Sequence, residues 1–433
     1  MLRRPTLAPI LLSALVVACS GDDPPLTPTA TAPALATPAP TAVPAEPRLQ
    51  VSDPQPFTIV PLLGPTPTWP EDVSDGANYP RRLVYDRETG TSAIVDSGDG
   101  AIWADWLGDS GLLVRLDNHA GIYDAVSGSW SVIELGFDLG LNSGAHASPD
   151  GSRIALEGPD GRLVLLDMRA LTYRTLDLIG REYVWSPDSS RLLVREQENR
   201  RRFSLIDAAD PSLRVLVPEE PLISGNSHGV AWLDLDHVAV ADGNPANIVV
   251  VSLGVSSPQT VLRQPVAEGP VSFSPDGNHF AVSRSGFQVS DEFTSLLAFY
   301  TLEPFALVAA YDGFAMHERG PAAWSAGGSR VVALRDPCSD GETLIVLDIA
   351  TGTQTDLAPV GTSQLAFSPD ETLVAYSAST PDAAGLFIVP ADGSAPPEAV
   401  FQLPGAPAAV YNPQWSPDGR FISFGLGGFG RCP

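Results

Sequence analysis

Apolar and polar side chains alternate along many short stretches of this chain, with the period of two residues that half-buried β-strands require. The stretches RIALEG (153–158) and HFAVS (279–283) show the alternation, and each follows a Ser-Pro-Asp-Gly turn. In such a turn proline presets φ, aspartate can bond its own backbone and glycine accepts a positive φ. The pattern therefore predicts β-hairpins.

An aromatic residue usually precedes this turn, and the combined phrase recurs at eight anchors separated by 41, 38, 47, 41, 51, 43 and 48 residues. Periods of this length are typical of the blades of β-propellers. Some anchors lack parts of the turn, so the repeat is degenerate. The anchors begin at Trp106, Ala147, Trp185, Trp232, Phe273, Trp324, Phe367 and Trp415.

A second hairpin follows most anchors, and it runs from a strand into an Asp-led turn, as in IYDAVSG (122–128) and VLDIATG (346–352). Each repeat therefore has four strands and no room for a crossover helix. We expect an all-β fold, a β-propeller of eight four-stranded blades, with seven blades as the alternative if one weak anchor is misread.

The last repeat is incomplete, because only two strands follow Trp415. Residues 82–96, RLVYDRETGTSAIVD, form a strand, a turn and a strand with no anchor before them. If these N-terminal strands complete the C-terminal blade, the ring closes and no open sheet edge remains at the seam.

The N-terminus has the features of an export signal. Arg3 and Arg4 precede an apolar run from Leu7 to Val17, which is too short to span a bilayer unaided. The sequence VVAC (16–19) resembles a bacterial lipobox, so residues 1–19 are interpreted as a lipoprotein signal peptide ending at a lipidated Cys19. An ordinary cleaved signal peptide is the alternative.

Residues 20–60 are rich in proline, threonine and alanine. Such a segment buries too little apolar surface to offset its ordering entropy and favours extended polyproline II. At about 3.1 Å per residue, some thirty residues give a tether of about 90 Å. We expect a disordered stalk over 20–60 and the propeller over 61–433.

The chain carries 51 acidic and 25 basic side chains, all of the latter arginine, for a formal net charge of −26. So negative a surface repels phosphate backbones and anionic headgroups, which disfavours nucleic-acid binding and peripheral membrane adhesion. The lipid is the only membrane contact that the sequence indicates.

The repeated phrase WSPDG-x-x-I-A-F, followed by I-Y-x-x-D-x-x-x-G, resembles the TolB-like repeat, a relative of WD repeats found in bacterial envelope propellers and in prolyl oligopeptidases. The resemblance covers about residues 80–433. It implies a protein- or ligand-binding platform in the cell envelope, with a partner docking at the funnel of one face. We expect the chain to be a monomer. We expect no counterpart of the hydrolase domain of prolyl oligopeptidases in this sequence, because no helical stretch long enough for it is predicted.

Two motifs match catalytic or cofactor-binding patterns in sequence but lack the secondary structure that these patterns require. GNSHG (225–229) fits the nucleophile elbow around Ser227, but a predicted strand follows it where the elbow needs a helix. GLGGFG (425–430) fits a dinucleotide loop but likewise lacks the helix. We therefore expect no catalytic residue and no cofactor.

The sequence indicates no metal site. The six histidines show no pair at metal-ligand spacing. The acidic loops at 96–100 and 336–342 lack the alternate-position spacing of a calcium loop.

Several polar residues lie in connections that lead into predicted inner strands or between second and third strands. These connections share one face of a propeller, so the residues are candidates for a binding site at the funnel. The alternatives are solvated loop residues with no common ligand, or an enzyme, a hydrolase or lyase acting on envelope glycans or peptides. The candidates are His146, His228, Glu268, His317, Arg319 and Asn412.

Cys338 and Cys432 remain if Cys19 is lipidated, and outside the cytoplasm such a pair is a possible disulfide. The two cysteines lie two blades apart in the repeat, and a bridge needs Cα atoms within about 7 Å. Only a mobile C-terminal tail would satisfy that limit, so a disulfide and two free thiols both remain open.

Overall fold

A computed structural model divides the chain into two units, Met1–Ala45 and Glu46–Pro433. All residues that the structure describes belong to the second unit. They are 48–62, 81–95, 104–116, 119–139, 144–158, 160–197, 203–217, 227–242, 247–253, 259–265, 271–289, 292–315, 323–335, 342–359, 364–379, 383–404 and 409–427.

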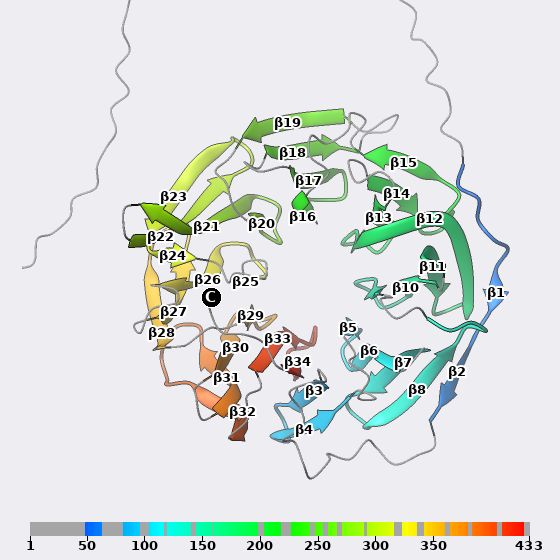
Figure 1. Cartoon of the computed structure of the whole chain (residues 1–433), viewed down its shortest axis with the longest axis horizontal. Coiled ribbons are helices and arrows are strands. Elements are labelled where there is room, and N and C mark those ends of the chain that lie inside the picture. The colour runs from blue at the N-terminus through cyan, green and yellow to red at the C-terminus, as the bar shows by residue number, and fades with distance from the viewer. Residues whose placement is uncertain are drawn as a thin grey trace, which may run out of the picture. The chain divides into compact units, whose positions relative to one another are not determined.

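The second unit is an all-β propeller whose antiparallel sheets succeed one another around a ring (Figure 1). Most sheets have four strands in chain order. The first half of the ring contains β5 (Ala104–Leu107), β6 (Gly111–Leu116), β7 (His119–Asp124), β8 (Ser129–Glu134), β9 (Ala145–Ala147), β10 (Arg153–Glu157), β11 (Arg162–Asp167), β12 (Thr172–Trp185), β13 (Arg191–Glu196), β14 (Phe203–Asp207), β15 (Arg214–Val217), β16 (Ser227–Trp232), β17 (His237–Asp242), β18 (Asn247–Ser252) and β19 (Gln259–Pro265).

The second half repeats the arrangement, with the inner strand of one sheet split into β24 and β25, which both pair with β26. Its strands are β20 (Val271–Phe273), β21 (His279–Val289), β22 (Glu292–Thr301), β23 (Ala306–Asp312), β24 (Phe314–Ala315), β25 (Ala323–Trp324), β26 (Arg330–Arg335), β27 (Thr343–Asp348), β28 (Gln354–Pro359), β29 (Leu365–Phe367), β30 (Leu373–Ser379), β31 (Ala383–Pro390) and β32 (Glu398–Pro404).

The strand β12 serves two sheets. Its first half, through Ile179, pairs with β11, and its second half, from Gly180, pairs with β13. One continuous strand therefore ends one four-stranded ladder and begins the next.

The ends of the propeller meet in one sheet, which we call the closing sheet. It has the order β33 (Ala409–Trp415), β34 (Phe421–Gly427), β3 (Arg81–Asp86) and β4 (Thr91–Ile94). Leu83 pairs with Phe424, and the ladder runs from Arg81 to Asp86. The prediction that N-terminal strands complete the C-terminal sheet is confirmed.

The core lies in layers between neighbouring sheets. On one side of the closing sheet, Leu83 and Phe424 pack with Leu386 of β31. On its other side, Val84 and Phe421 pack against the β5–β8 sheet. Because the closing sheet buries both faces, the ring is held shut by apolar contacts as well as by strand pairing.

The anchor tryptophans bind each sheet to the one before it. Each indole Nε1–H donates a hydrogen bond to the preceding sheet, where the acceptor residue stands directly before that sheet's anchor. The donor–acceptor distances are 3.0 to 3.3 Å. Four acceptors are main-chain carbonyls and the fifth is the Ser272 hydroxyl. The pairs are Trp106 to Gln414, Trp185 to His146, Trp232 to Val184, Trp324 to Ser272 and Trp415 to Ala366.

We expect Trp185→Phe to lower the free energy of unfolding by about 1 kcal/mol, because phenylalanine leaves the His146 carbonyl without its indole donor. Denaturant unfolding measures the change. The matched control is Trp130→Phe, since the buried Trp130 Nε1–H has no partner in the described part of the chain. Equal losses in both variants would contradict a role for the hydrogen bond.

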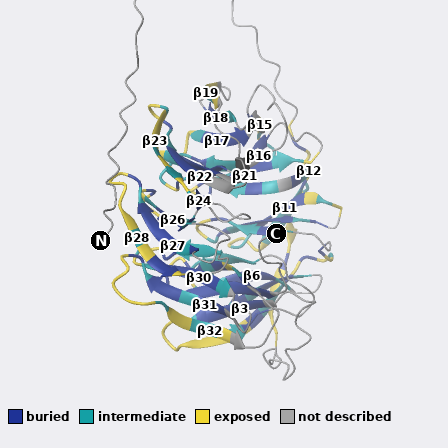
Figure 2. Cartoon of the chain, turned by 60° about the vertical axis from the view of Figure 1, so that its left-hand side comes forward, coloured by how far each residue is buried: buried dark blue, intermediate teal, exposed yellow. Residues whose placement is uncertain are grey.

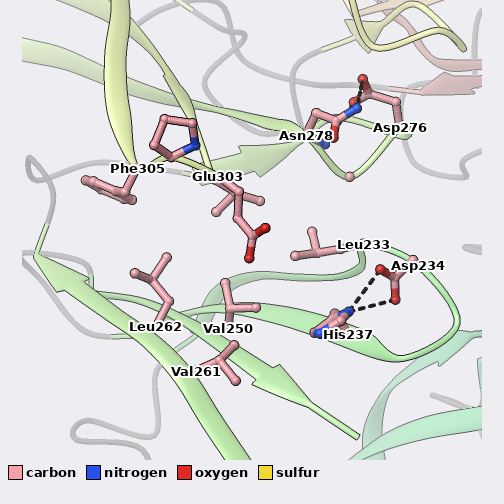
Figure 3. Close-up of a pocket in the computed structure, with 13 residues that line it drawn as sticks. Leu233, Asp234, His237, Val250, Val261, Leu262, Asp276, Asn278, Glu303 and Phe305 are labelled. Carbon is pink, nitrogen blue, oxygen red and sulfur yellow. Dashed lines mark hydrogen bonds and ion pairs between the residues drawn. The ribbon is translucent and has the colours of Figure 1, made fainter.

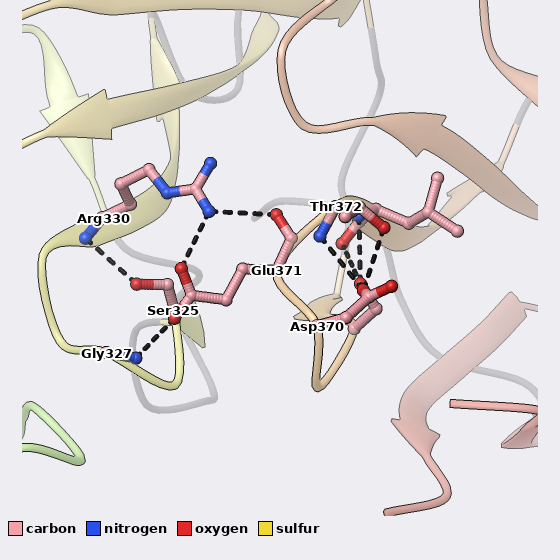
Figure 4. A network of polar contacts seen from close by, with 8 residues as sticks. Ser325, Gly327, Arg330, Asp370, Glu371 and Thr372 are labelled. Carbon is pink, nitrogen blue, oxygen red and sulfur yellow. Dashed lines mark hydrogen bonds and ion pairs between the residues drawn. The ribbon is translucent and has the colours of Figure 1, made fainter. Parts of the chain in front are cut away.

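The turns after the anchors also touch from sheet to sheet, as Figure 4 shows for two of them. Arg330 of β26 donates from Nη2 to the Glu371 carbonyl at 3.0 Å and to its Oε2 at 2.8 Å. The Gly327 main-chain N–H donates to Glu371 Oε1. The predicted turn chemistry therefore also forms contacts between sheets.

The structure differs from the predicted stalk at its C-terminal end. Residues 48–61 include β1 (Gln55–Pro56), which pairs with β12, and β2 (Thr58–Pro61), which pairs with β8. Leu49 and Phe57 are buried. These apolar side chains give the segment the burial that the proline-rich part before it lacks.

Other outer strands carry exposed side chains, as Figure 2 shows for β23, β28 and β32. In the described residues no helix is long and apolar enough to cross a membrane.

Candidate functional site

Two of the six candidate funnel residues are described in full. His146 lies on β9, where its ring is 5.5 Å from that of Tyr183 and burial lowers its pKa. Asn412 is exposed at a bulge of β33, with φ of +49°, and its main-chain N–H donates to the Gln364 side chain. The two residues share none of these contacts.

The other candidates are only partly placed or not placed. His228 lies on β16, and of this residue only the main chain is described, where the strand continues as the sequence predicted. The remaining predicted residues lie outside the described residues. They are Glu268, His317, Arg319, Cys338, Cys432 and Cys19.

A cavity of about 530 Å³ lies elsewhere, between the β16–β19 sheet and the β20–β23 sheet (Figure 3). Its walls include the β16–β17 turn, the β20–β21 turn and the β22–β23 turn. These turns share the face opposite to the connections that enter the inner strands. The candidate residues predicted from the sequence all belong to that other face.

The β16–β17 turn supplies a carboxylate and an imidazole. His237 Nδ1 lies 2.9 and 3.0 Å from the two Asp234 carboxylate oxygens. Partial burial raises the pKa of Asp234, but the bonds from His237 and the Asp236 main chain outweigh it and hold the pKa below its ordinary value. Asp234 is therefore ionised at neutral pH.

The β20–β21 turn has the predicted Ser-Pro-Asp-Gly form. Asn278 donates from Nδ2 to Asp276 Oδ2 at 2.8 Å, and its main-chain N–H donates to Oδ1 at 3.1 Å. Burial opposes the charge of Asp276, yet the Ser274 and Asn278 bonds lower its pKa overall. The Asp276 carboxylate therefore accepts hydrogen bonds from residues of its own turn.

Gly277 makes the close approach of the two turns possible. Its φ is +72°, and a Cβ at this position would lie 2.2 Å from the Leu233 carbonyl oxygen. Only glycine satisfies both conditions. The two walls of the cavity therefore touch through main chain.

The β22–β23 turn places Glu303 at the cavity. Figure 3 shows its carboxylate pointing into the space between Leu233 and Val250. Among the described residues no donor bonds this carboxylate. The sequence LEPF (302–305) gave no signal of this role, because it looks like an ordinary proline turn.

The remaining walls are apolar. Val250 on the floor is 5% exposed, whereas Val261 near the outer edge is 52% exposed. A cavity with apolar walls and a few polar groups at fixed positions is the usual form of a ligand site. The other apolar lining residues are Leu233, Leu262, Leu302, Pro304 and Phe305.

The charge of this lining is negative. The lining contains three carboxylates and one imidazole, and the described lining has no arginine. No group of three metal-ligating side chains occurs among the described residues. The arrangement favours a ligand that combines positive charge with apolar surface.

A second polar cluster is buried at the seam. Arg82 of β3 donates to Gln414 Oε1 at 2.9 Å and to Ser423 Oγ at 3.1 Å, and burial lowers its pKa to about 10. Asp105 of β5 accepts the Ala147 main-chain N–H at 3.0 Å. Burial raises the pKa of Asp105 to about 6, although the Ala147 bond and the Arg82 charge oppose the shift.

Comparisons with known proteins find no matching family model and no similar curated protein. Solved structures with similar architecture include the Swd1 β-propeller domain of Myceliophteria thermophila, with 12% identity over 64% of this chain and 95% of that one and a TM-score of 0.43. An oligogalacturonate lyase in complex with manganese has 14% identity over 65% and 85%, with a TM-score of 0.46. A TolB-like protein from Agrobacterium tumefaciens has 12% identity over 80% and 97%, with a TM-score of 0.37. At these values the likeness concerns the fold alone.

Proposed function

We propose that this chain is a binding propeller of the cell envelope, held to a membrane by a lipid on Cys19. The observation that carries the binding role is the cavity between the β16–β19 and β20–β23 sheets, with apolar walls and a Glu303 carboxylate directed into it. The lipobox-like sequence at residues 16–19 supports the location.

The rival function is an enzyme at the funnel, a hydrolase or lyase. It depends on His146, His228 and His317 converging with carboxylates. Of these, only His146 has a described side chain. Its ring lies 5.5 Å from that of Tyr183, burial lowers its pKa, and among the described residues no hydrogen bond joins it to a carboxylate. The described contacts therefore favour the binding role.

The proposed anchor predicts the behaviour of Cys19→Ser. We expect the full-length wild type to incorporate radiolabelled palmitate and to partition into detergent, and the variant to do neither, because the thiol carries the lipid. A variant that still partitions into detergent and still labels would contradict lipidation at this cysteine.

The binding role predicts the behaviour of Val261→Trp in the full chain. Val261 is exposed, so the larger ring should fill the mouth of the cavity without disturbing the core. We expect the wild type to crosslink a defined set of proteins in membranes of the source organism, and the variant to lose at least one of them. An unchanged pattern would remove the cavity as the binding site.

A further inference from the structure

We infer that the cavity receives a lysine or arginine side chain from an apolar segment of a partner protein, with Glu303 as its counter-ion. This inference rests on the proposed binding function and adds the chemistry of the ligand.

The three carboxylates at the cavity are not equivalent. Asp276 is bonded by Ser274 and Asn278 and serves its own turn. Asp234 is bonded by His237 and by the main chain of Asp236. Glu303 alone of the three has no hydrogen bond or ion pair within the described residues, so its charge is available to a ligand.

The position of Glu303 selects a cation with an apolar stem. Glu303 is exposed, and its carboxylate lies near Leu233 and Val250 (Figure 3), so a cation bound to it would have apolar side chains beside it. Lysine and arginine bury their methylene stems against such surface while the charged end finds a polar partner. A bare metal ion would meet only one available carboxylate here.

The surroundings favour a protein segment over a free amine. Val261 in the lining is 52% exposed. Leu307 lies on β23, two residues after the lining residue Phe305, and is 57% exposed. Leu235, in the same turn as Leu233 and Asp234, is 43% exposed. A small amine would leave these side chains in water, whereas apolar neighbours of a basic residue would cover them.

The net charge of the whole chain also favours a basic ligand. The formal charge of the chain is −26, which attracts a basic segment before contact. Removal of any carboxylate weakens this attraction slightly, so the test needs a control that removes one negative charge away from the cavity.

The test uses fluorescence anisotropy with two labelled pentapeptides at pH 7.5, an apolar sequence with a central lysine and the same sequence with norleucine in its place. We expect the lysine peptide to bind the full chain about tenfold more tightly than the norleucine peptide, because a hydrogen bond to a charged group contributes about 1.5 kcal/mol. Glu303→Gln should remove this preference. The matched control Glu398→Gln, on the outer strand β32, should keep it.

Each other outcome overturns a stated part of the inference. A lysine preference that survives in Glu303→Gln would exclude Glu303 as the counter-ion. Free butylammonium that competes as effectively as the lysine peptide would exclude the protein segment. If Val261→Trp loses a crosslinked partner and Glu303→Gln does not weaken the lysine peptide, the binding function stands and the ligand chemistry is wrong.

Discussion

Replacing Phe424 by alanine is expected to lower the free energy of unfolding by about 3 to 5 kcal/mol. Phe424 is fully buried on β34, and its ring centroid lies 5.1 Å from that of Phe401. It pairs across the seam with Leu83 of β3. The substitution therefore opens a cavity in the layer that joins the two ends of the propeller.

Denaturant unfolding of the full chain measures this effect, with Val308→Ala as control. Val308 is 41% exposed on the outer strand β23, so its truncation should change stability by less than about 0.5 kcal/mol. A loss below about 1 kcal/mol for Phe424→Ala would show that this ring is not packed against the first strands. The closure of the ring would then need another explanation.

The titration of Asp105 is expected to lower stability as the pH rises from about 4 to about 6. Burial raises its pKa from 3.8 to about 6, so the folded state binds this proton more tightly than the unfolded state. The stabilising contribution is complete below pH 3.8 and is lost as the pH rises through 6. A shift of this size corresponds to about 3 kcal/mol.

Asp105→Asn removes the partly buried charge, and its Oδ1 can still accept the Ala147 N–H. We expect this variant to be more stable than the wild type at pH 8 by about 1 to 2 kcal/mol, since the added amide N–H groups offset part of the gain. At pH 4 the difference should disappear. Denaturant unfolding at both pH values measures the difference in free energy of unfolding. Asp109→Asn, in the exposed turn that follows, is the control. If Asp105→Asn were less stable than the wild type at pH 8, the predicted direction of the Asp105 effect would be wrong.

Local chemistry could be predicted because it depends on neighbouring residues. Alternation over RIALEG marked β10, and the Asp-led turns form as expected: Asp124 accepts the main-chain N–H of Ser127 at 2.7 Å. The missing half of the last repeat even predicted the closing sheet. By contrast, β1 and β2 could not be predicted from their proline-rich context. Their own residues are exposed, and they are held by backbone pairing with β12 and β8 and by the buried neighbours Leu49 and Phe57.

The cavity could not be predicted in this way. Asp234, Asp276 and Glu303 belong to three turns of two sheets, and only the packing of those sheets, with Gly277 against the Leu233 carbonyl, brings them to one space. The same holds for Asp105, whose pKa depends on burial at the seam. The sequence by itself determined strands, turns and the closing of the ring, because these follow from local patterns and their count. The tertiary structure alone decided which charges are desolvated, paired or left available, because desolvation depends on neighbours distant in the chain.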